Sequence, residues 1–200
     1  DYEMKNENCY GSISENLNVA NNSINTIPEE FYNISTLERL YAENNQLPTL
    51  STNVGNFINL LILNVSGNRI DLMPSTIGNL TKLHTFNFER NLITLLPPEF
   101  GNMIELISVN GSQNNIASIP SEFGQLSKLN TLDLSTNKIT NTPSEFSNLT
   151  ELETLYLNNN QLQVVAGLSG FTKLKRLRLS SNRLGEDNPN FNTDLPDNLG

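Results

Sequence analysis

The 200-residue sequence contains no tryptophan, one cysteine (Cys9) and one histidine (His84). A lone cysteine cannot form an intrachain disulfide, which favours a reducing compartment, and it provides neither a metal site nor a redox pair. His84 could act as a general base only with a nucleophile and an orienting partner, and no motif supplies them. The sequence therefore predicts no enzymatic activity, no cofactor and no metal site, and a structural or surface role for His84.

Basic residues and long apolar runs are also scarce. The chain has 12 Lys and Arg against 21 Asp and Glu, a net charge of -9, whereas a nucleic-acid-binding protein normally presents a basic surface. No apolar run approaches the roughly 18 residues that a membrane-spanning helix needs. We therefore expect no nucleic-acid partner and no insertion into a membrane.

Asparagine, in contrast, is abundant, with 34 copies beside 31 leucines and 14 isoleucines. Asparagine favours neither helix nor strand interiors, so it indicates either disorder or a fold with many turns. Because Leu and Ile together supply 45 residues, a hydrophobic core is available and disorder fits badly.

Leucine and asparagine recur at a fixed distance. The clearest copies are LDLSTNKI (132–139), LYLNNNQL (155–162) and LRLSSNRL (177–184), which extend to the pattern L-x-x-L-x-L-x-x-N-x-L, with Ile also allowed at the last position. Successive pattern asparagines are 23 residues apart six times and 22 apart once; they are Asn22, Asn45, Asn68, Asn91, Asn114, Asn137, Asn160 and Asn182. Such a period indicates a repeat protein.

A second phrase alternates with the first, as in MPSTIGNLTKL (73–83) and IPSEFGQLSKL (119–129). With these motifs, residues 14–184 resemble the leucine-rich repeat family, in particular its 23-residue class, found in Ras-group or Ras-suppressor-like intracellular proteins. The resemblance implies an α/β solenoid shaped as a right-handed horseshoe of about eight repeats. Its parallel β-sheet would line the concave face, and short helical, 3₁₀ or irregular segments would form the convex side.

The spacing of apolar residues and the need to pair buried backbone groups predict the same architecture. The L-x-L alternation is typical of a short strand with its leucines on one face, and one copy is too small to bury that face alone. The pattern asparagine follows the strand, where a buried amide can pair with backbone groups of adjacent turns. On the convex side we expect prolines to delay helix formation and phenylalanines to fill the outer layer; they are Pro74, Pro97, Pro120, Pro143, Phe100, Phe123 and Phe146.

Departures from the pattern predict local packing and domain limits. Ala42 and Gly111 stand where other repeats have an inward leucine, and we expect Phe88 to fill the space left at Gly111. Residues 1–13 match no repeat and are predicted to be a leader or partial cap. Residues 185–200 read as a polar connection followed by the start of a truncated further repeat, so we expect the natural protein to continue.

Outward side chains of the strands would form one extended concave surface, the expected site of function in a solenoid. Arg and Tyr dominate binding energy at protein interfaces, so Arg39, Tyr41, Tyr156, Arg176 and Arg178 are the expected anchors. The complete predicted partner-binding set is Arg39, Tyr41, Glu43, Asn64, Asn87, Glu89, Asn110, Asp133, Tyr156, Arg176 and Arg178.

Charge is uneven along the chain. Five of the 12 basic residues lie between Lys173 and Arg183. One hypothesis is that an acidic partner docks at this C-terminal end; the alternative is that these charges keep a terminal repeat soluble or contact a continuation of the chain.

The sequence thus favours a protein-binding scaffold in intracellular signalling, located in the cytoplasm, and the family resemblance implies a small GTPase or a phosphatase as partner. Two alternatives stay open: an extracellular recognition ectodomain, and a regulatory segment of a larger enzyme such as a phosphatase, kinase or cyclase. Six N-x-[ST] sequons do not decide the compartment, because roughly six are expected by chance from 34 Asn and 34 Ser plus Thr.

Overall fold

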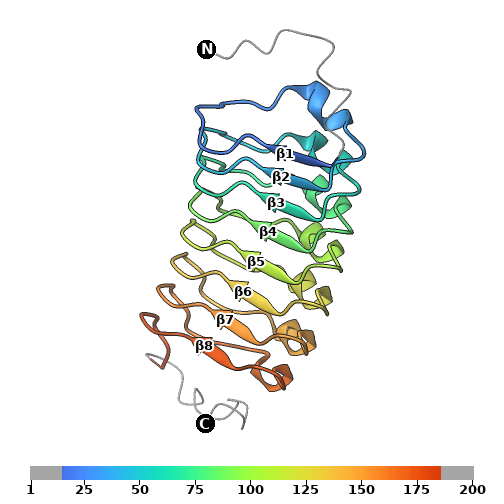
Figure 1. Ribbon diagram of the computed structural model, residues 1–200. Helices are drawn as coiled ribbons and strands as arrows, with labels where there is room; N and C mark the ends of the chain where they lie inside the picture. The colour runs from blue at the N-terminus through green and yellow to red at the C-terminus, as the bar shows by residue number, and fades with distance from the viewer. Residues whose placement is uncertain (1–14, 186–200) are drawn as a thin grey trace.

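The computed structural model describes residues 15–185, which form one continuous stack of turns (Figure 1). The predicted leader, residues 1–13, lies outside the described residues. So does the predicted polar connection and truncated repeat, residues 185–200, apart from Gly185.

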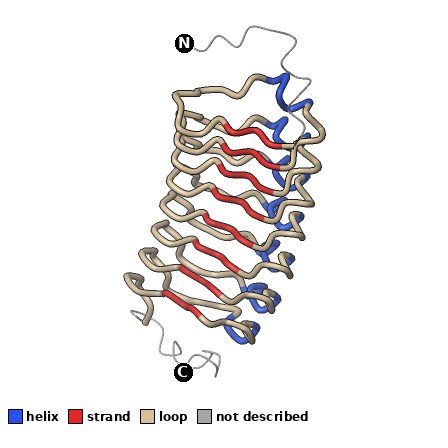
Figure 2. Tube along the Cα trace, viewed as in Figure 1, coloured by secondary structure: helices blue, strands red, loops and turns tan. Residues whose placement is uncertain are grey.

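Eight three-residue strands make one parallel sheet in the order β1 to β8. Figure 2 shows them stacked in a single column, with the short helices in a second column beside it. Partner residues in adjacent strands are 23 positions apart, as in Leu40↔Leu63, until β7 and β8, where Leu155 pairs with Leu177. The predicted parallel sheet of eight repeats is therefore confirmed. The strands are Asn16–Asn18, Arg39–Tyr41, Ile62–Asn64, Thr85–Asn87, Ser108–Asn110, Thr131–Asp133, Thr154–Tyr156 and Arg176–Arg178.

The return segments contain short 3₁₀ helices, as a 23-residue period allows. In four of them, η3 to η6, the residue that precedes the helix is one of the predicted prolines, in extended conformation. The predicted outer phenylalanines are fully buried, and the rings of Phe100 and Phe123 stack with centroids 4.6 Å apart. The helices are η1 (Glu29–Asn33), η2 (Thr52–Asn56), η3 (Ser75–Asn79), η4 (Pro98–Asn102), η5 (Ser121–Gln125), η6 (Ser144–Asn148) and η7 (Leu168–Gly170).

The pattern asparagines from Asn45 onward connect each turn to the one before it, whereas Asn22 is exposed and donates only to Val19 and Ala20 of its own turn. Asn114 is 9 % exposed; its Oδ1 accepts a hydrogen bond from the Ile93 backbone N–H at 3.0 Å, one repeat earlier. Its Nδ2 donates to the carbonyl oxygens of Phe88 (3.0 Å), Gly111 (3.1 Å) and Ser112 (3.2 Å). Asn45, Asn68, Asn91, Asn137 and Asn160 repeat this arrangement. The predicted structural role of these asparagines is confirmed.

We predict that Asn114→Ala lowers the free energy of unfolding by about 2 kcal/mol or more, because the buried Ile93 N–H loses its acceptor. Urea denaturation followed by circular dichroism measures this. Asn102→Ala, at the exposed end of η4, is the matched control and should change stability by less than about 0.5 kcal/mol. Equal effects of the two substitutions would contradict a structural role specific to Asn114.

Phe88 fills the space at Gly111, as the sequence predicts. Both residues are buried, and a Cβ placed on Gly111 would overlap the edge of the Phe88 ring. Phe88 also packs on Phe86, with ring centroids 4.8 Å apart. The missing leucine of the fifth repeat is thus compensated by a large ring in the fourth.

Gly111→Ala is expected to destabilise the fold by about 1–3 kcal/mol through overpacking against Phe88. Phe88→Leu in the same chain should recover part of that loss, so the two substitutions should be coupled by at least about 0.5 kcal/mol in a double-mutant cycle. Gly124→Ala serves as the control, because a Cβ there would meet the Glu145 carbonyl oxygen at 2.5 Å and not Phe88. If Gly111→Ala and Phe88→Leu proved additive, the packing explanation would be wrong.

Candidate functional site

The register of the sheet brings the outward side chains of all eight strands onto one surface, here called the strand face. The middle residue of each strand points to the core, as Leu63 and Phe86 do, so the first and third residues point outward. Alternation continues past each strand end, since Ala42 and Phe88 are buried and the residues after them are half-buried. All eleven predicted partner-binding residues therefore lie on the strand face.

These residues do not form a single cluster. Tyr41 lies on β2 and Tyr156 on β7, five strands apart in the sheet, which corresponds to about 24 Å at the usual strand spacing. The predicted aromatic anchors thus belong to opposite ends of the strand face, with polar residues between them.

The central asparagines are partly committed to local structure. Oδ1 of Asn64 accepts hydrogen bonds from the backbone N–H of Ser66 at 3.2 Å and from its hydroxyl at 2.9 Å. Asn110 makes the same two contacts with Ser112, at 3.1 and 2.8 Å, and Oδ1 of Asn87 accepts from the Glu89 N–H at 3.1 Å. Each of these oxygens thus holds the chain where it leaves the strand, while no group in residues 15–185 accepts a hydrogen bond from the amide N–H₂ groups of Asn64 and Asn87.

Asp133 is the register neighbour of Asn110 and places a charged group in line with these asparagines. One carboxylate oxygen, Oδ1, accepts hydrogen bonds from the N–H of Ser135 at 2.9 Å and from its hydroxyl at 2.6 Å. The other oxygen is not engaged by these bonds. Asp133 therefore presents a fixed negative charge to a partner.

The other two acidic residues differ in their surroundings. Glu89 accepts hydrogen bonds from Asn110 Nδ2 at 3.1 Å and from Gln113 Nε2 at 2.8 Å, which hold its carboxylate in place. In the described part of the chain, Oε2 of Glu43 is buried and has no hydrogen-bond partner.

Arg39 lies towards the N-terminal end of the strand face, on β2. Its Nη1 donates to Asn16 Oδ1 at 3.2 Å, and its Nη2 lies 3.9 Å from Glu38 Oε2, so the guanidinium already has local partners.

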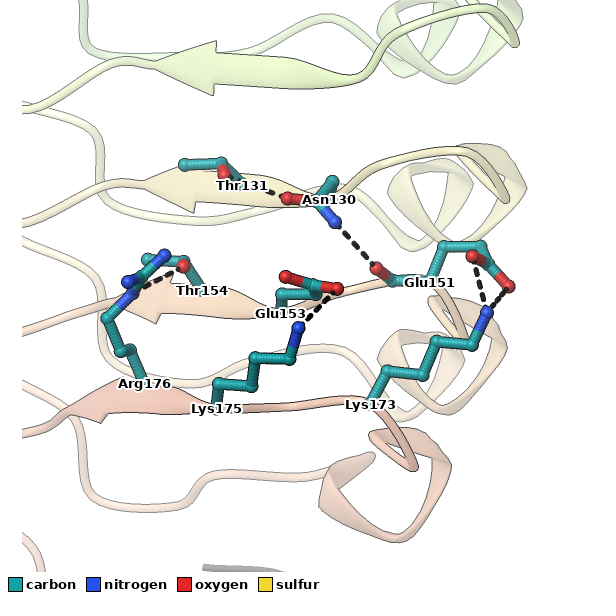
Figure 3. Close-up of polar contacts among 8 residues, drawn as sticks. All are labelled: Asn130, Thr131, Glu151, Glu153, Thr154, Lys173, Lys175 and Arg176. Carbon is teal, nitrogen blue, oxygen red and sulfur yellow. Dashed lines mark hydrogen bonds and ion pairs between the residues drawn. The ribbon is translucent and has the colours of Figure 1, made fainter.

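The C-terminal end of the strand face is the most strongly charged part. Lys173 Nζ lies 2.7 Å from Glu151 Oε1, and Lys175 Nζ lies 2.9 Å from Glu153 Oε1, so both lysines are neutralised across adjacent repeats (Figure 3). The hydrogen bond from Lys175 is the main reason that the pKa of Glu153 is lowered from its ordinary value.

Arg176 and Arg178 are arranged differently from these lysines. Arg176 Nε donates to Thr154 Oγ1 at 3.0 Å, as Figure 3 shows. The guanidinium carbon of Arg178 lies 4.5 Å from the centre of the Tyr156 ring, a cation–π contact. Tyr156 and Arg178 are thus in direct contact, and Arg176 lies two residues before Arg178 on the same outward side of β8; these three residues are here called the arginine cluster.

Sequence reasoning missed two exposed apolar groups beside the strands. Ile104 (50 % exposed) and Ile107 (46 %) precede β5, while Leu72 (59 %), Leu92 (50 %) and Leu95 (56 %) follow β3 and β4. The signal was available, because these residues occupy repeat positions where other copies carry polar side chains, such as Ser118 and Asn130 at the positions of Leu95 and Ile107.

The described residues offer no evident site for chemistry. Residues 15–185 contain no group of three or more His, Cys, Asp and Glu side chains that could hold a metal ion. His84 is half-buried directly before β4, and its backbone N–H and C=O pair with Leu61 and Ile107, both at 2.9 Å. A cavity of about 660 Å³ opens at the first repeat, beside Leu17, Ile24 and Phe31, and not on the strand face. No helix in the same residues is long and apolar enough to cross a bilayer.

Known structures resemble this architecture closely. A leucine-rich-repeat protein of Leptospira interrogans is 36 % identical, with a TM-score of 0.81 over 85 % of this chain and 44 % of its own. The ectodomain of the Arabidopsis thaliana receptor kinase GASSHO1/SCHENGEN3, solved with CASPARIAN STRIP INTEGRITY FACTOR 2, is 30 % identical (TM-score 0.73; 85 % of this chain, 24 % of that one). The Arabidopsis receptor kinase HAESA, solved with the peptide hormone IDA and the co-receptor SERK1, is 27 % identical (TM-score 0.76; 85 % and 30 %). The chain therefore spans less than half the length of each of these proteins.

Sequence models of the repeat match as well. The model described as leucine rich repeat matches residues 108–162, that of two leucine rich repeat copies matches 150–198, and a single-repeat model matches 59–80. No curated protein matches the chain. Together with the asparagine-linked stack of parallel strands, these matches establish that the chain belongs to the leucine-rich repeat family.

Proposed function

We propose that the chain is an interaction module of intracellular signalling that binds a protein partner on its strand face. The observation that carries this proposal is the strand face itself. Eight parallel strands present their outward side chains in register over on the order of 33 Å, long enough for a helix or loop of another protein.

The chemistry of the face supports protein binding over binding of a small molecule. Small-molecule sites are concave and mostly apolar, whereas the centre of this face consists of half-buried Asn, Ser, Thr and Asp side chains on β4 to β6. Tyr and Arg, which stand at the ends of the face, are residue types that protein interfaces favour. HAESA and GASSHO1 were each solved with a peptide or protein partner, which agrees with this use of the fold.

The proposal can be tested by blocking the face at its centre. Ser108→Arg places a long cationic side chain on β5, where Ser108 is half-buried. We expect it to weaken binding of the partners captured by the wild-type chain by at least about tenfold, because the bulky side chain prevents close contact. Quantitative affinity capture from the source organism, followed by titration of the recovered partner, measures the change.

Ser75→Arg is the matched control, since it makes the same replacement at an exposed position of η3 on the return side. It should keep both the partners and their affinities. Loss of binding in Ser75→Arg with retention in Ser108→Arg would place the interface on the return side and reject the strand face.

The 23-residue period and its resemblance to Ras-group repeat proteins support a cytoplasmic location, with a small GTPase or a phosphatase as partner class. A second candidate is an extracellular recognition ectodomain. It is favoured by the structural similarity to GASSHO1, whose solved part is an ectodomain.

A protease-shaving experiment separates the two locations. If the protein is cytoplasmic, treating intact source cells with proteinase K should leave its tryptic peptides intact until the cells are lysed. Mass spectrometry of the tryptic peptide 129–138 follows them, and a known surface protein of the same cells is the positive control. Cleavage in intact cells would favour the ectodomain.

A further inference from the structure

Arg176 and Arg178 stand out because both are held in place by uncharged neighbours. They are the first and last residues of β8, and both are exposed on the strand face. The strand register pairs Arg176 with Thr154 and Arg178 with Tyr156, the residues that contact them. Because Arg176 and Arg178 are two residues apart on one strand, their Cα atoms lie about 7 Å apart and their side chains point to the same side.

Within the described residues, most N–H donors of these two arginines have no acceptor. A guanidinium has five N–H donors, and Thr154 accepts only the one on Nε of Arg176. Stacking on the Tyr156 ring engages the face of the Arg178 guanidinium and leaves the N–H groups at its edge free to bind an acceptor. Within residues 15–185 neither arginine makes an ion pair, whereas Lys173 and Lys175 each have a glutamate partner.

Local charge here is opposite to that of the whole chain. Among Glu151, Glu153, Lys173, Lys175, Arg176 and Arg178, four basic residues outnumber two acidic ones, a local charge of +2 in a chain of -9. The charge of Arg176 contributes to the lowered pKa of Glu153, but less than the hydrogen bond from Lys175 does. At physiological salt a charge acts over roughly 8 Å, so a ligand that reaches β8 senses the arginines more than the distant acidic residues.

The rest of the strand face limits where an acidic ligand can lie. Asp133 on β6 is the register neighbour of Tyr156 and lies two strands from the arginines of β8, and Glu89 follows β4, so the negative charge of the face begins at β6. An acidic segment is therefore attracted to β7 and β8 and repelled further along the face. A partner that spans the face would need an acidic end over β8 and neutral or basic groups over β6.

We propose that Arg176 and Arg178, positioned by Thr154 and Tyr156, bind a pair of carboxylates in an acidic segment of a protein partner. This inference rests on the proposed protein-binding function and names the partner chemistry at one end of the strand face. Asp or Glu residues at positions i and i+2 of an extended segment have side chains on one side about 7 Å apart, which matches the spacing of the two arginines. The cluster thus sets the orientation of the partner along the solenoid.

The test titrates the full chain with a ten-residue peptide that has Asp at two alternate positions near one end and Lys near the other. Side-chain Nε–Hε signals of arginine are followed by NMR at low and physiological salt. We expect saturable shifts of the Arg176 and Arg178 signals that weaken with salt, and at least about tenfold weaker binding after Arg176→Gln with Arg178→Gln. The same peptide with Asn in place of Asp should bind no better than that double variant.

Arg69→Gln with Arg90→Gln is the matched control, because it removes the same charge at two exposed arginines outside β8. It should leave affinity for the acidic peptide within about twofold of the wild type. Equal losses in both double variants, equal binding of the Asn peptide, equal binding of a single-stranded DNA of similar length, or no binding of the acidic peptide would each overturn the inference.

Failure of the acidic-segment inference can be distinguished from failure of the proposed protein-binding function. If Ser108→Arg abolishes partner binding while Arg176→Gln with Arg178→Gln leaves both partner and peptide binding unchanged, the strand face binds a protein and the acidic-segment inference is wrong. If Ser108→Arg has no effect but the peptide binds at Arg176 and Arg178, the arginine cluster acts without the wider face.

Discussion

The hydrogen bonds of the pattern asparagines are the constraint on which the rest of the structure depends. A three-residue strand has to end in a turn that leaves backbone groups inside the stack, and a buried unpaired group is costly. A side-chain amide offers both an acceptor and two donors, so Asn91, for example, accepts from Ile70 of the preceding repeat and donates to Val65 of that repeat and to its own Phe88. The fixed distance between these asparagines keeps the strands in register. Register, in turn, decides which side chains reach the core and which reach the strand face.

The same periodicity explains why so much of the fold could be predicted. Leucines at alternate positions identify the strands, and the spacing of the asparagines identifies the neighbours of each strand. Even the compensation between Phe88 and Gly111 follows from the sequence, because a stack leaves only the adjacent repeats as possible partners for an unfilled core position. What the pattern did not show is the backbone conformation before each asparagine. Arg90, Gln113 and Thr136 have φ near +56° there, in the left-handed region that favours glycine or asparagine. The repeat thus tolerates unfavourable local conformations for the sake of its turn geometry, and Asn21, Asn44 and Asn159 at the same position account for part of the asparagine excess.

The candidate site was less predictable than the fold, for a physical reason. Register places a side chain on the strand face, but it does not determine what else that side chain contacts. Asn64 and Asn110 were predicted as partner-binding residues, and their side-chain carbonyl oxygens also hold the serines two residues later. Arg39 and Arg178 looked equivalent as anchors, yet Arg39 contacts Glu38 and Asn16 while Arg178 lies over an aromatic ring. These differences depend on rotamers and on neighbours in adjacent repeats, which residue spacing alone does not encode.

Repetition of one structural unit also means that functional asymmetry has to come from the variable positions. The core and the asparagine bonds are nearly the same in every turn, so they cannot distinguish one end of the solenoid from the other. Acidic groups on the strand face, such as Glu89 and Asp133, are followed by the two arginines of β8, and this order gives the face a direction. A partner that binds along such a face meets negative charge near β4 and β6 and positive charge at β8, so the orientation with opposite charges in contact is favoured over its reverse. Because these side chains make few contacts with the core, they can change without loss of the fold, and specificity is free to vary while the repeat is retained.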